Sequence, residues 1–335
     1  MTTNGKKVAV VGATGLVGQE MLRVLAQRKF PVSELIPIAS ERSVGKKIPF
    51  NDRDWSVVAV SKDAFKDVDL ALFSAGAATS KEWCPVAAEQ GALVVDNSSA
   101  WRMDPEVPLC VPEVNLNTAR KPPRGIIANP NCSTIQMVVA LKPIHDAAKI
   151  RRIVVATYQA ISGAGARAVE DFRKQNLGSH EARSGKNTSV LAGNLLMSWK
   201  VDAASGYQEE ELKLVNETRK ILGDATIAVS PTTVRVPVIT AHSEAVTIEC
   251  ARPIDAKEAR SLLERAPGVR VIDDFANGVY PTPLDAAGID DVLVGRIRND
   301  IGHPGGLQMW IVGDNLRKGA ALNAVQIAEG LLLTS

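Results

Sequence analysis

This sequence of 335 residues has little of what marks several specialised classes of protein. Aromatic residues make up only 4%, and the formal net charge is +2 with no run of lysine and arginine. Stacking platforms and basic patches for nucleic acid are therefore not expected. No apolar run approaches the roughly 18 residues of a membrane span, and the N-terminus lacks the apolar core of a signal peptide. We expect a cytoplasmic protein that binds neither nucleic acid nor a membrane.

Cysteine and histidine are scarce as well, with four residues of each type. They are Cys84, Cys110, Cys132, Cys250, His145, His180, His242 and His303. No C-x-x-C pair occurs, which argues against a disulfide scaffold and a zinc ribbon, and the histidines are scattered. The sequence therefore predicts no metal site.

The apolar pattern changes along the chain. Up to about residue 130, short apolar runs alternate with helical patterns, as in βαβ units. Strands are expected there at 7–11, 35–39, 57–60, 68–73, 92–96 and 126–128, and helices at 16–28 and 81–90. Later strands are expected at 152–159, 226–229, 233–238, 245–250, 292–297 and 307–312, the last two as an antiparallel pair. Residues 177–208 show no clear pattern, and residues 315–333 form an amphipathic helix.

These patterns predict an α/β fold with two domains. A Rossmann-type dinucleotide-binding domain would comprise residues 1–131 and 315–335. A second, α+β domain with a mainly antiparallel sheet would comprise residues 132–314. The C-terminal helix is assigned to the first domain because its apolar face needs covering and Rossmann sheets carry helices on both faces.

The first strand runs directly into a glycine-rich turn, Gly12-Ala13-Thr14-Gly15-Leu16-Val17-Gly18. Glycines allow a sharp turn and the close approach of a pyrophosphate, which binds free N–H groups at the start of the next helix. The order of strand, turn and helix indicates a dinucleotide site, with a tight turn without ligand as the alternative. After the second strand, Glu41 could bind the ribose of NAD, whereas Arg42 and Ser43 could bind the 2′-phosphate of NADP. The arginine favours NADP.

Cys132 stands between polar turn residues and an apolar run, in the stretch ANPNCSTIQM. Pro130 ends the preceding strand, and Asn131 can cap a helix that runs to about Lys142, before Pro143. A thiol in the first turn lies at the positive end of the helix dipole, which favours the thiolate. The N–H groups there could also bind an oxyanion. We interpret Cys132 as a nucleophile, with a buried structural cysteine as the alternative.

A nucleophilic thiol needs a proton acceptor, and an acyl group bound to it needs orientation. His242 follows a strand, although a lone histidine is more often structural. Arg235 lies between two valines, and a buried guanidinium requires a partner such as a substrate carboxylate. Gln159 ends another strand, before a loop of small residues at 161–165.

Three further charged residues are candidates for substrate binding. Arg102 ends a βα segment of the first domain. Glu210 and Lys213 lie three residues apart on one helical face, where they could offer an anion and a cation to a zwitterionic substrate. Ordinary surface charge is the alternative for all three.

The chain resembles the bacterial branch of the aspartate-β-semialdehyde dehydrogenase family over essentially its whole length. The stretches that carry the resemblance are VAVVGATGLVGQEML, DNSSAWRM, VPEVN, IIANPNCSTIQMV, TYQAISGAG, VNETRKIL, VRVPV, HSEAV, VGRIR and DNLRKGAALNAVQIAE. The most specific feature is NPNCSTIQM followed downstream by YQAISGAG.

The resemblance implies an NADP-binding Rossmann domain and a catalytic and dimerisation domain, in a homodimer or a dimer of dimers. It implies NADPH-dependent reduction of L-aspartyl 4-phosphate to aspartate 4-semialdehyde and phosphate. This reaction leads to lysine through diaminopimelate, and to methionine, threonine and isoleucine.

The resemblance also implies roles for individual residues. Cys132 matches the acyl-thioester nucleophile and His242 the general acid/base. The substrate-binding positions are Gln159 for the thioester, Arg235 for the α-carboxylate, Glu210 for the ammonium, and Arg102 with Lys213 for the phosphate. The cofactor contacts are Gly12, Thr14, Gly15, Leu16, Val17, Arg42, Ser43, Ser162, Gly163 and Gln308.

The sequence departs from the family in a shorter segment at 177–208, in Thr233 where a cysteine is common, and in Ala241 where a glycine is common. The nearest alternative is a related acyl-phosphate reductase of the N-acetyl-glutamyl-phosphate type, whose substrate lacks the free ammonium that Glu210 would bind. A non-catalytic redox sensor that binds a dinucleotide is the alternative from another class. It leaves Arg235 and His242 unexplained.

Overall fold

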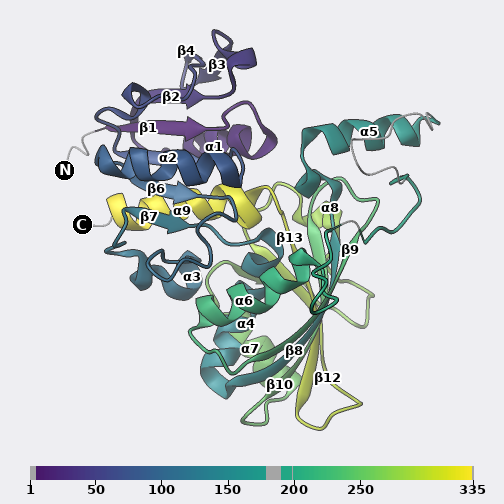
Figure 1. Ribbon diagram of the computed structural model, residues 1–335. Helices are drawn as coiled ribbons and strands as arrows, with labels where there is room; N and C mark the ends of the chain where they lie inside the picture. Colours follow the sequence, from purple (N-terminus) through teal and green to yellow (C-terminus); the bar gives the residue numbers. More distant parts are fainter. Residues whose placement is uncertain (1–4, 179–189, 198, 334–335) are drawn as a thin grey trace. The chain divides into compact units, whose positions relative to one another are not determined.

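The computed structural model describes residues 5–178, 190–197 and 199–333 (Figure 1). The chain divides into two compact units. Unit 1 comprises Met1–Asn131 and Ala320–Ser335, and unit 2 comprises Cys132–Gly319. The second unit therefore continues five residues beyond the boundary expected at 314. Unit 1 carries a parallel sheet and unit 2 a mixed one, which confirms the predicted α/β class.

Unit 1 is built on a five-stranded parallel sheet in the order β2-β1-β5-β6-β7. The strands are β1 (Lys6–Val11), β2 (Val32–Ile38), β5 (Leu70–Phe73), β6 (Leu93–Asp96) and β7 (Ile126–Ala128). The main helices are α1 (Leu16–Gln27), α2 (Ala77–Glu89) and α9 (Leu322–Leu332), with a single turn at α3 (Pro112–Asn115). The C-terminal helix α9 packs on α1 and β6 and shares their apolar core, so its predicted return to the first domain is confirmed.

One part of unit 1 differs from the sequence prediction. The expected strand at 57–60 is wrong, because only an isolated bridge joins Val58 to Ile38. Instead, β3 (Lys47–Phe50) and β4 (Arg53–Ser56) form an antiparallel hairpin that the sequence pattern did not indicate. Both strands are four residues long and carry charged and polar residues, so their alternation is weak.

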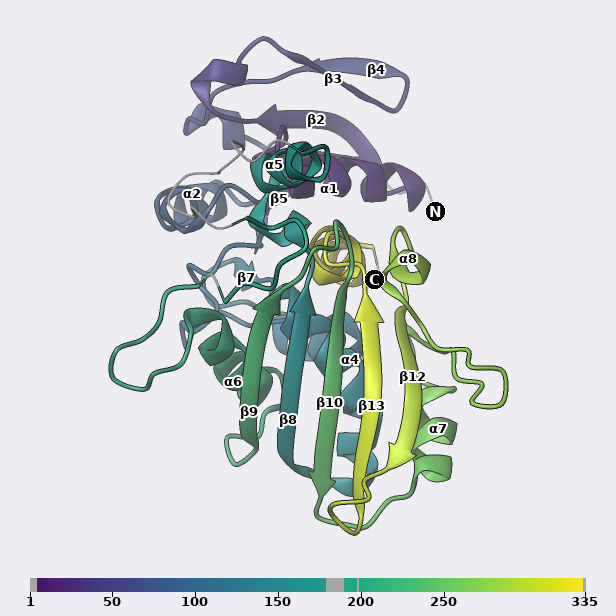
Figure 2. The same cartoon turned by 90° about the vertical axis from the view of Figure 1, so that its right-hand side faces the viewer.

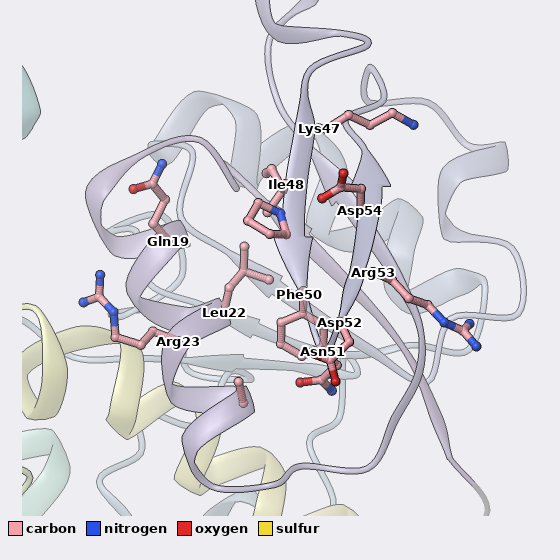
Figure 3. A pocket seen from close by; sticks show the side chains of 12 residues that line it. Gln19, Leu22, Arg23, Lys47, Ile48, Phe50, Asn51, Asp52, Arg53 and Asp54 are labelled. Carbon is pink, nitrogen blue, oxygen red and sulfur yellow. The ribbon is translucent and has the colours of Figure 1, made fainter.

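A pocket of about 820 Å³ lies between α1 and this hairpin (Figure 3). Arg23 and Asp54 bring opposite charges to its wall, and Leu22 and Phe50 supply apolar surface. Arg23 also pairs with Glu20 on the same helix. The lining contains neither a cysteine nor a histidine, so this pocket lacks the nucleophile on which the predicted chemistry depends.

Unit 2 is built on a six-stranded mixed sheet in the order β11-β12-β13-β10-β8-β9 (Figure 2). The strands are β8 (Ile150–Gln159), β9 (Ala228–Arg235), β10 (His242–Cys250), β11 (Val269–Val271), β12 (Val292–Asn299) and β13 (Gly306–Gly313). β10 is antiparallel to both β8 and β13, whereas β8 and β9 are parallel. The predicted antiparallel pair β12–β13 is confirmed.

Helices cover one face of this sheet. They are α4 (Cys132–Ala148), α6 (Glu209–Leu222) and α7 (Ala256–Leu263), which Figure 1 shows on the same side. The other helices of unit 2 are α5 (Ala166–Asn176) and the single turn α8 (Pro283–Ala286). The opposite face is open among the described residues of unit 2, and Tyr158 lies on it with 38% of its surface exposed. Side chains therefore alternate between a helix-covered face and an open face.

Three element boundaries differ from the prediction, two in unit 2 and one at the start of the C-terminal helix. Helix α4 does not end before Pro143 but continues to Ala148, because the loss of one N–H donor is outweighed by burial of Ile144 and Ala148. The two strands expected at 226–238 are one strand, β9, which ends at Arg235. The C-terminal helix begins with a π turn at Arg317–Ala321 before regular α-helix starts at Leu322. Of the segment 177–208, residues 179–189 and 198 lie outside the described residues.

Candidate active site

Three of the predicted site residues meet at one end of the sheet of unit 2 because of strand register. The last residues of the parallel strands β8 and β9, Gln159 and Arg235, are direct partners. β10 runs antiparallel to β8 and begins at His242, one residue before Ser243 pairs with Tyr158. All three side chains are buried on the helix-covered face, with exposed fractions of 1%, 7% and 0%. Helix α4 packs on the same face and starts at Cys132.

The cysteine and the histidine are in direct contact. The Sγ atom of Cys132 lies 3.1 Å from Nε2 of His242. The other ring nitrogen, Nδ1, accepts a hydrogen bond of 2.9 Å from the backbone N–H of Ala160. Burial, followed by the nearby guanidinium of Arg235, lowers the pKa of His242 to about 3, and Glu210 opposes this shift. The imidazole is therefore neutral at physiological pH.

Arg235 is fixed from three sides. Its Nη1 donates to the carbonyl oxygen of Ala160 at 2.6 Å. The guanidinium carbon lies 4.6 Å from the ring centre of Trp199, a cation–π distance. A Cβ atom on Gly163 would lie 3.1 Å from Nη1, so this glycine allows the loop at 161–164 to approach. Burial lowers the pKa of Arg235, whereas Cys132 and Glu210 raise it.

Glu210 and Lys213 form a salt bridge one turn apart on α6, with 2.8 Å between carboxylate and ammonium. The second carboxylate oxygen accepts a hydrogen bond of 3.3 Å from Nε2 of Gln159. Glu210 is 4% exposed and Lys213 is half-buried, so the surface-charge alternative does not describe Glu210. The carboxylate, the amide and the guanidinium of Arg235 provide groups of both signs beside the thiol.

Asn315 is a member of this site that sequence reasoning missed. Its Oδ1 accepts from the N–H of Ala241 at 2.9 Å, and its Nδ2 donates to Oγ of Ser162 at 2.9 Å. Ala241 has φ of 74°, the left-handed region that favours glycine, and precedes His242. Asn315 thus ties the loop after β8 to the strained turn that delivers His242. Its position inside the stretch DNLRKGAALNAVQIAE was the available signal.

Gln308 is not brought to this site. It lies on β13 opposite Thr247, about 17 Å along the strands from His242 at the usual rise per residue. Its side chain accepts from Arg298 at 2.6 Å and donates to Asp300 at 3.2 Å. Thr247 and Gln308 are half-buried while their neighbours Ile248 and Leu307 are fully buried, which places Gln308 on the open face. The cofactor contact at Gln308 therefore stays a prediction.

The glycine-rich turn of unit 1 has the geometry of a phosphate cradle. Gly12 has φ of 88°, and a Cβ atom there would lie 2.3 Å from the carbonyl oxygen of Ser74. A Cβ atom on Gly18 would lie 2.2 Å from the carbonyl oxygen of Gly12. Gly15 caps α1 without a side-chain hydrogen bond, and the first turn has no acidic residue. This helix start therefore presents N–H groups to an anion, as a dinucleotide pyrophosphate requires.

The remaining candidates also lie in unit 1. Arg42 and Ser43 belong to a short 3-10 turn, Glu41–Ser43, that follows β2, and Arg42 is exposed. Thr14 is exposed, and Leu16 and Val17 are partly exposed at the start of α1. Arg102 is 8% exposed, and its guanidinium donates to the carbonyl oxygens of Asn129 and Asn97, each at 3.0 Å. Arg102 and Lys213, the predicted phosphate pair, thus belong to different units.

The other cysteines lack the surroundings of a nucleophile. Cys84 and Cys110 are fully buried. Burial raises the pKa of Cys84 and raises that of Cys250 to about 11. In the part of the chain that the structure describes, no group of three histidine, cysteine or acidic residues is placed to hold a metal ion. None of the described helices is long and apolar enough to span a membrane.

Two family models match the chain, in the order of the two units. Residues 7–121 match the NAD binding domain of semialdehyde dehydrogenase, and residues 141–318 match the semialdehyde dehydrogenase dimerisation domain. The chain thus has the two domains of a semialdehyde dehydrogenase, an NAD binding domain followed by a dimerisation domain.

Curated and solved relatives narrow this class. Aspartate-semialdehyde dehydrogenase of Aquifex aeolicus is 54% identical, over 98% of this chain and 98% of its own. The crystal structure of aspartate semialdehyde dehydrogenase II from Vibrio cholerae complexed with ASA is 48% identical, with 98% of both chains covered and a TM-score of 0.94. The structure from Candida albicans with NADP is 26% identical, covers 98% and 99%, and has a TM-score of 0.75. The chain belongs to the aspartate-semialdehyde dehydrogenase family.

Proposed function

We propose that the protein reduces L-aspartyl 4-phosphate with NADPH to L-aspartate 4-semialdehyde and phosphate, through a thioester on Cys132. The observation that carries the proposal is the contact of 3.1 Å between Cys132 Sγ and His242 Nε2 at the start of α4. Around this pair, unit 2 supplies a buried guanidinium, an amide and a carboxylate. These groups match a substrate that carries a carboxylate, an acyl group and an ammonium.

Each side chain of the site has a defined partner on that substrate. The fork of Arg235 binds the α-carboxylate, because a guanidinium pairs with a carboxylate through two parallel hydrogen bonds. Glu210, which also pairs with Lys213, binds the ammonium. Gln159 orients the acyl oxygen by its side-chain amide. Arg102 and Lys213 bind the phosphate.

The covalent chemistry takes place on Cys132. Its thiolate attacks the acyl carbon, and the phosphate leaves with the electron pair of the broken C–O bond. N–H groups at the start of α4 and Nε2 of His242 stabilise the negatively charged oxygen of the tetrahedral adduct. The acyl group then remains on sulfur as a thioester, the group that would accept a hydride.

NADP fits the residues of unit 1. The glycine turn would hold the pyrophosphate, and Arg42 with Ser43 would hold the 2′-phosphate, which an arginine binds better than the hydroxyls of NAD. Ser162 and Gly163 of unit 2 would contact the nicotinamide half. When bound, NADPH supplies the hydride.

The test is an assay of NADPH formation from NADP, aspartate semialdehyde and phosphate, repeated with NAD and with N-acetyl-glutamate semialdehyde. Phosphate-dependent reduction of NADP with the aspartyl substrate alone supports the proposal. Turnover of only the N-acetyl substrate would favour the related reductase. Binding of NADP without turnover of either aldehyde would favour a redox sensor.

We further infer that a second copy of the chain covers the open face of the sheet of unit 2. The rings of Tyr158 and Trp310 pack there in a tilted arrangement, with 5.4 Å between ring centres, and Trp310 lines a pocket of about 360 Å³. Arg296 and Arg298 line the same pocket and bring positive charge to it. Sedimentation of the Trp310→Glu variant should show monomers where the wild type shows a dimer or larger assembly.

The proposed activity places the protein in amino-acid biosynthesis. Its product is the precursor of lysine through diaminopimelate, and of methionine, threonine and isoleucine. Because both NADPH and an acyl phosphate are intracellular metabolites, we infer that the enzyme works in the cytoplasm.

A further inference from the structure

Gln136 and Glu244 form a buried polar pair beside the cysteine and the histidine, and neither has a role in the proposed chemistry. Gln136 is 1% exposed and lies on α4, four residues after Cys132. Glu244 is 0% exposed and lies on β10, two residues after His242. At these spacings, each residue lies on the same face of its element as the group that it follows.

We propose that Gln136 and Glu244 are positioning residues, which fix the start of β10 against the start of α4 and thereby set the distance between His242 and Cys132. The side-chain amide of Gln136 is the link between the two elements, and Glu244 holds this amide in place. The inference rests on the proposed function, because it assigns to the pair an effect on the step that takes place on Cys132.

The amide of Gln136 reaches the backbone of the histidine. Its Nε2 donates to the carbonyl oxygen of His242 at 3.4 Å. An amide nitrogen carries two hydrogens and can therefore serve two acceptors at once. The second acceptor is the carboxyl group of Glu244, on which Gln136 acts through a side-chain hydrogen bond. One side chain of α4 thus joins two residues at the start of β10.

The carboxyl group of Glu244 has little else to bind. Apart from Gln136, neither of its oxygens has a hydrogen-bond partner among the described residues, and no described charged side chain acts on it. Burial raises the pKa of Glu244 well above its usual range and so favours the neutral acid, whereas Gln136 opposes this rise. A buried polar group loses free energy when it gives up a partner, so the contact with Gln136 is maintained.

Gly313 provides the space that the amide occupies. It is the residue of β13 that pairs with His242. A Cβ atom at position 313 would lie 2.8 Å from Oε1 of Gln136 and 3.2 Å from its Cβ. Real Cβ atoms do not approach an oxygen so closely, so a side chain there would displace the amide. Three elements of unit 2, α4, β10 and β13, therefore define where the amide lies.

Loss of this link should affect the rate of reaction more than the binding of substrate. The proposed substrate-binding groups Arg235 and Glu210 belong to β9 and α6, whereas the link joins α4 to β10. A displacement of the reacting atoms by about 1 Å can lower the rate by about 100-fold. A role in stability alone would instead lower Tm and leave kcat of the folded protein unchanged.

Steady-state kinetics of the full chain with aspartate semialdehyde, phosphate and NADP test the proposal. Gln136→Met keeps the length of the side chain and removes the amide, and Glu244→Leu removes the carboxyl group. Each should lower kcat by about 10- to 100-fold and leave KM within about threefold of the wild type. Glu244→Gln keeps the size and the neutral, hydrogen-bonding character of the side chain, so kcat should stay within about threefold of the wild type.

Thr218→Val is the matched control. Thr218 is also fully buried in unit 2, and its hydroxyl has no hydrogen-bond partner among the described residues. The assays are run well below the lowest Tm of the set. Normal kcat in Gln136→Met would overturn the proposal, and so would equal losses in Gln136→Met and Thr218→Val. A loss in Glu244→Gln as large as that in Glu244→Leu would also overturn it.

The double variant Gln136→Met/Glu244→Leu shows whether the two residues act through one link. Residues of one hydrogen-bonded unit do not have additive effects. The kcat of the double variant should therefore equal that of the slower single variant, whereas the product of the two losses would contradict the proposal. Should Glu244→Leu fail to fold, Gly313→Ala displaces the same amide, and an unchanged kcat in that variant would also contradict it.

The rate of alkylation of Cys132 by iodoacetamide tests the link without substrate. A cysteine in contact with a histidine owes part of its reactivity to that contact, so the rate should fall in Gln136→Met and Glu244→Leu and be retained in Glu244→Gln. Equal rates in the wild type and all variants would overturn the proposal. A wild type that follows this order but does not oxidise aspartate semialdehyde would contradict the proposed function and leave the positioning role supported.

Discussion

Gly319 lies so close to Cys132 that a Cβ atom at position 319 would be 2.8 Å from the Cβ of the cysteine and 3.3 Å from its Cα. Gly319 belongs to the π turn that precedes α9, and it is the last residue of unit 2. A contact under 3.0 Å requires one of the two backbones to move. Because glycine has no Cβ atom, Cys132 can occupy its observed position without a clash at residue 319.

Gly319→Ala should lower kcat by about 100-fold, because a displacement of the reacting atom of about 1 Å has an effect of that order. Steady-state kinetics with aspartate semialdehyde measure it. Gly302→Ala is the matched control, since a Cβ atom there would meet only Asp300 at 3.5 Å. Equal activity of the two variants would show that the contact with Cys132 is unimportant.

Cys132→Ser should abolish turnover and leave NADP affinity unchanged, because the hydroxyl is a much weaker nucleophile than a thiolate. Iodoacetamide at pH 7.5 should modify one thiol rapidly. Cys250 should react only as the pH approaches its raised pKa of about 11, where its thiolate forms. Peptide mapping identifies the modified residue, and Cys250→Ser serves as the active control. Rapid labelling at Cys250 would contradict the assignment.

Arg235→Lys should raise KM for aspartate semialdehyde by about 10- to 100-fold, because an ammonium cannot form the two parallel hydrogen bonds of a guanidinium. The same change also removes the stacking on Trp199. Arg124→Lys is a matched control, as Arg124 stacks on Trp101 in unit 1 at 5.0 Å. A KM near that of the wild type in Arg235→Lys would exclude the carboxylate role.

Trp199→Leu tests the stacking by itself. A cation–π contact contributes about 0.5–2 kcal/mol, so KM should rise by about 2- to 30-fold with kcat nearly unchanged. A loss confined to kcat would instead assign Trp199 to the chemical step.

Glu244→Gln should stabilise the protein at neutral pH. Burial raises the pKa of this carboxyl well above its usual range, and Gln136 offsets the shift only in part. Because the pKa of Glu244 is raised in the folded state, the contribution of this carboxyl to the free energy of unfolding is fully present below pH 4. That contribution is lost as the pH rises through the folded-state pKa. The amide removes this loss, so the gain in Tm should be present at pH 8 and absent at pH 4. Thermal unfolding at both values measures it.

The sequence was sufficient to predict those parts of the site that depend on residue type and on the order of neighbouring elements. The strand, glycine turn and helix at Gly12 are local, and so is the helix start at Cys132. The structure confirms both as geometry. The helix end predicted before Pro143 is wrong, because burial of α4 against the rest of unit 2 outweighs the one backbone N–H donor that proline lacks.

Groups that act through the backbone or through distant contacts could not be found in this way. Ala160 contributes an N–H and a carbonyl oxygen, which every alanine has, so nothing in its identity marks it. Asn315 meets Ser162 across 153 positions of sequence. Gln308 was assigned by resemblance alone, and its place on the open face of the sheet, opposite Thr247, follows from a strand register that the sequence pattern does not give.

The parallel pairing of β8 with β9 also bears on how the site is assembled during folding. Arg152 pairs with Ala228, and Gln159 pairs with Arg235. Before these pairs can form, the intervening chain, which contains α5 and α6, must close into a long loop. Closing such a loop loses chain entropy before any contact compensates for it, which slows folding. Gln159 and Arg235 come together only at that step. Recovery of catalytic activity after denaturation should therefore lag behind recovery of helical structure.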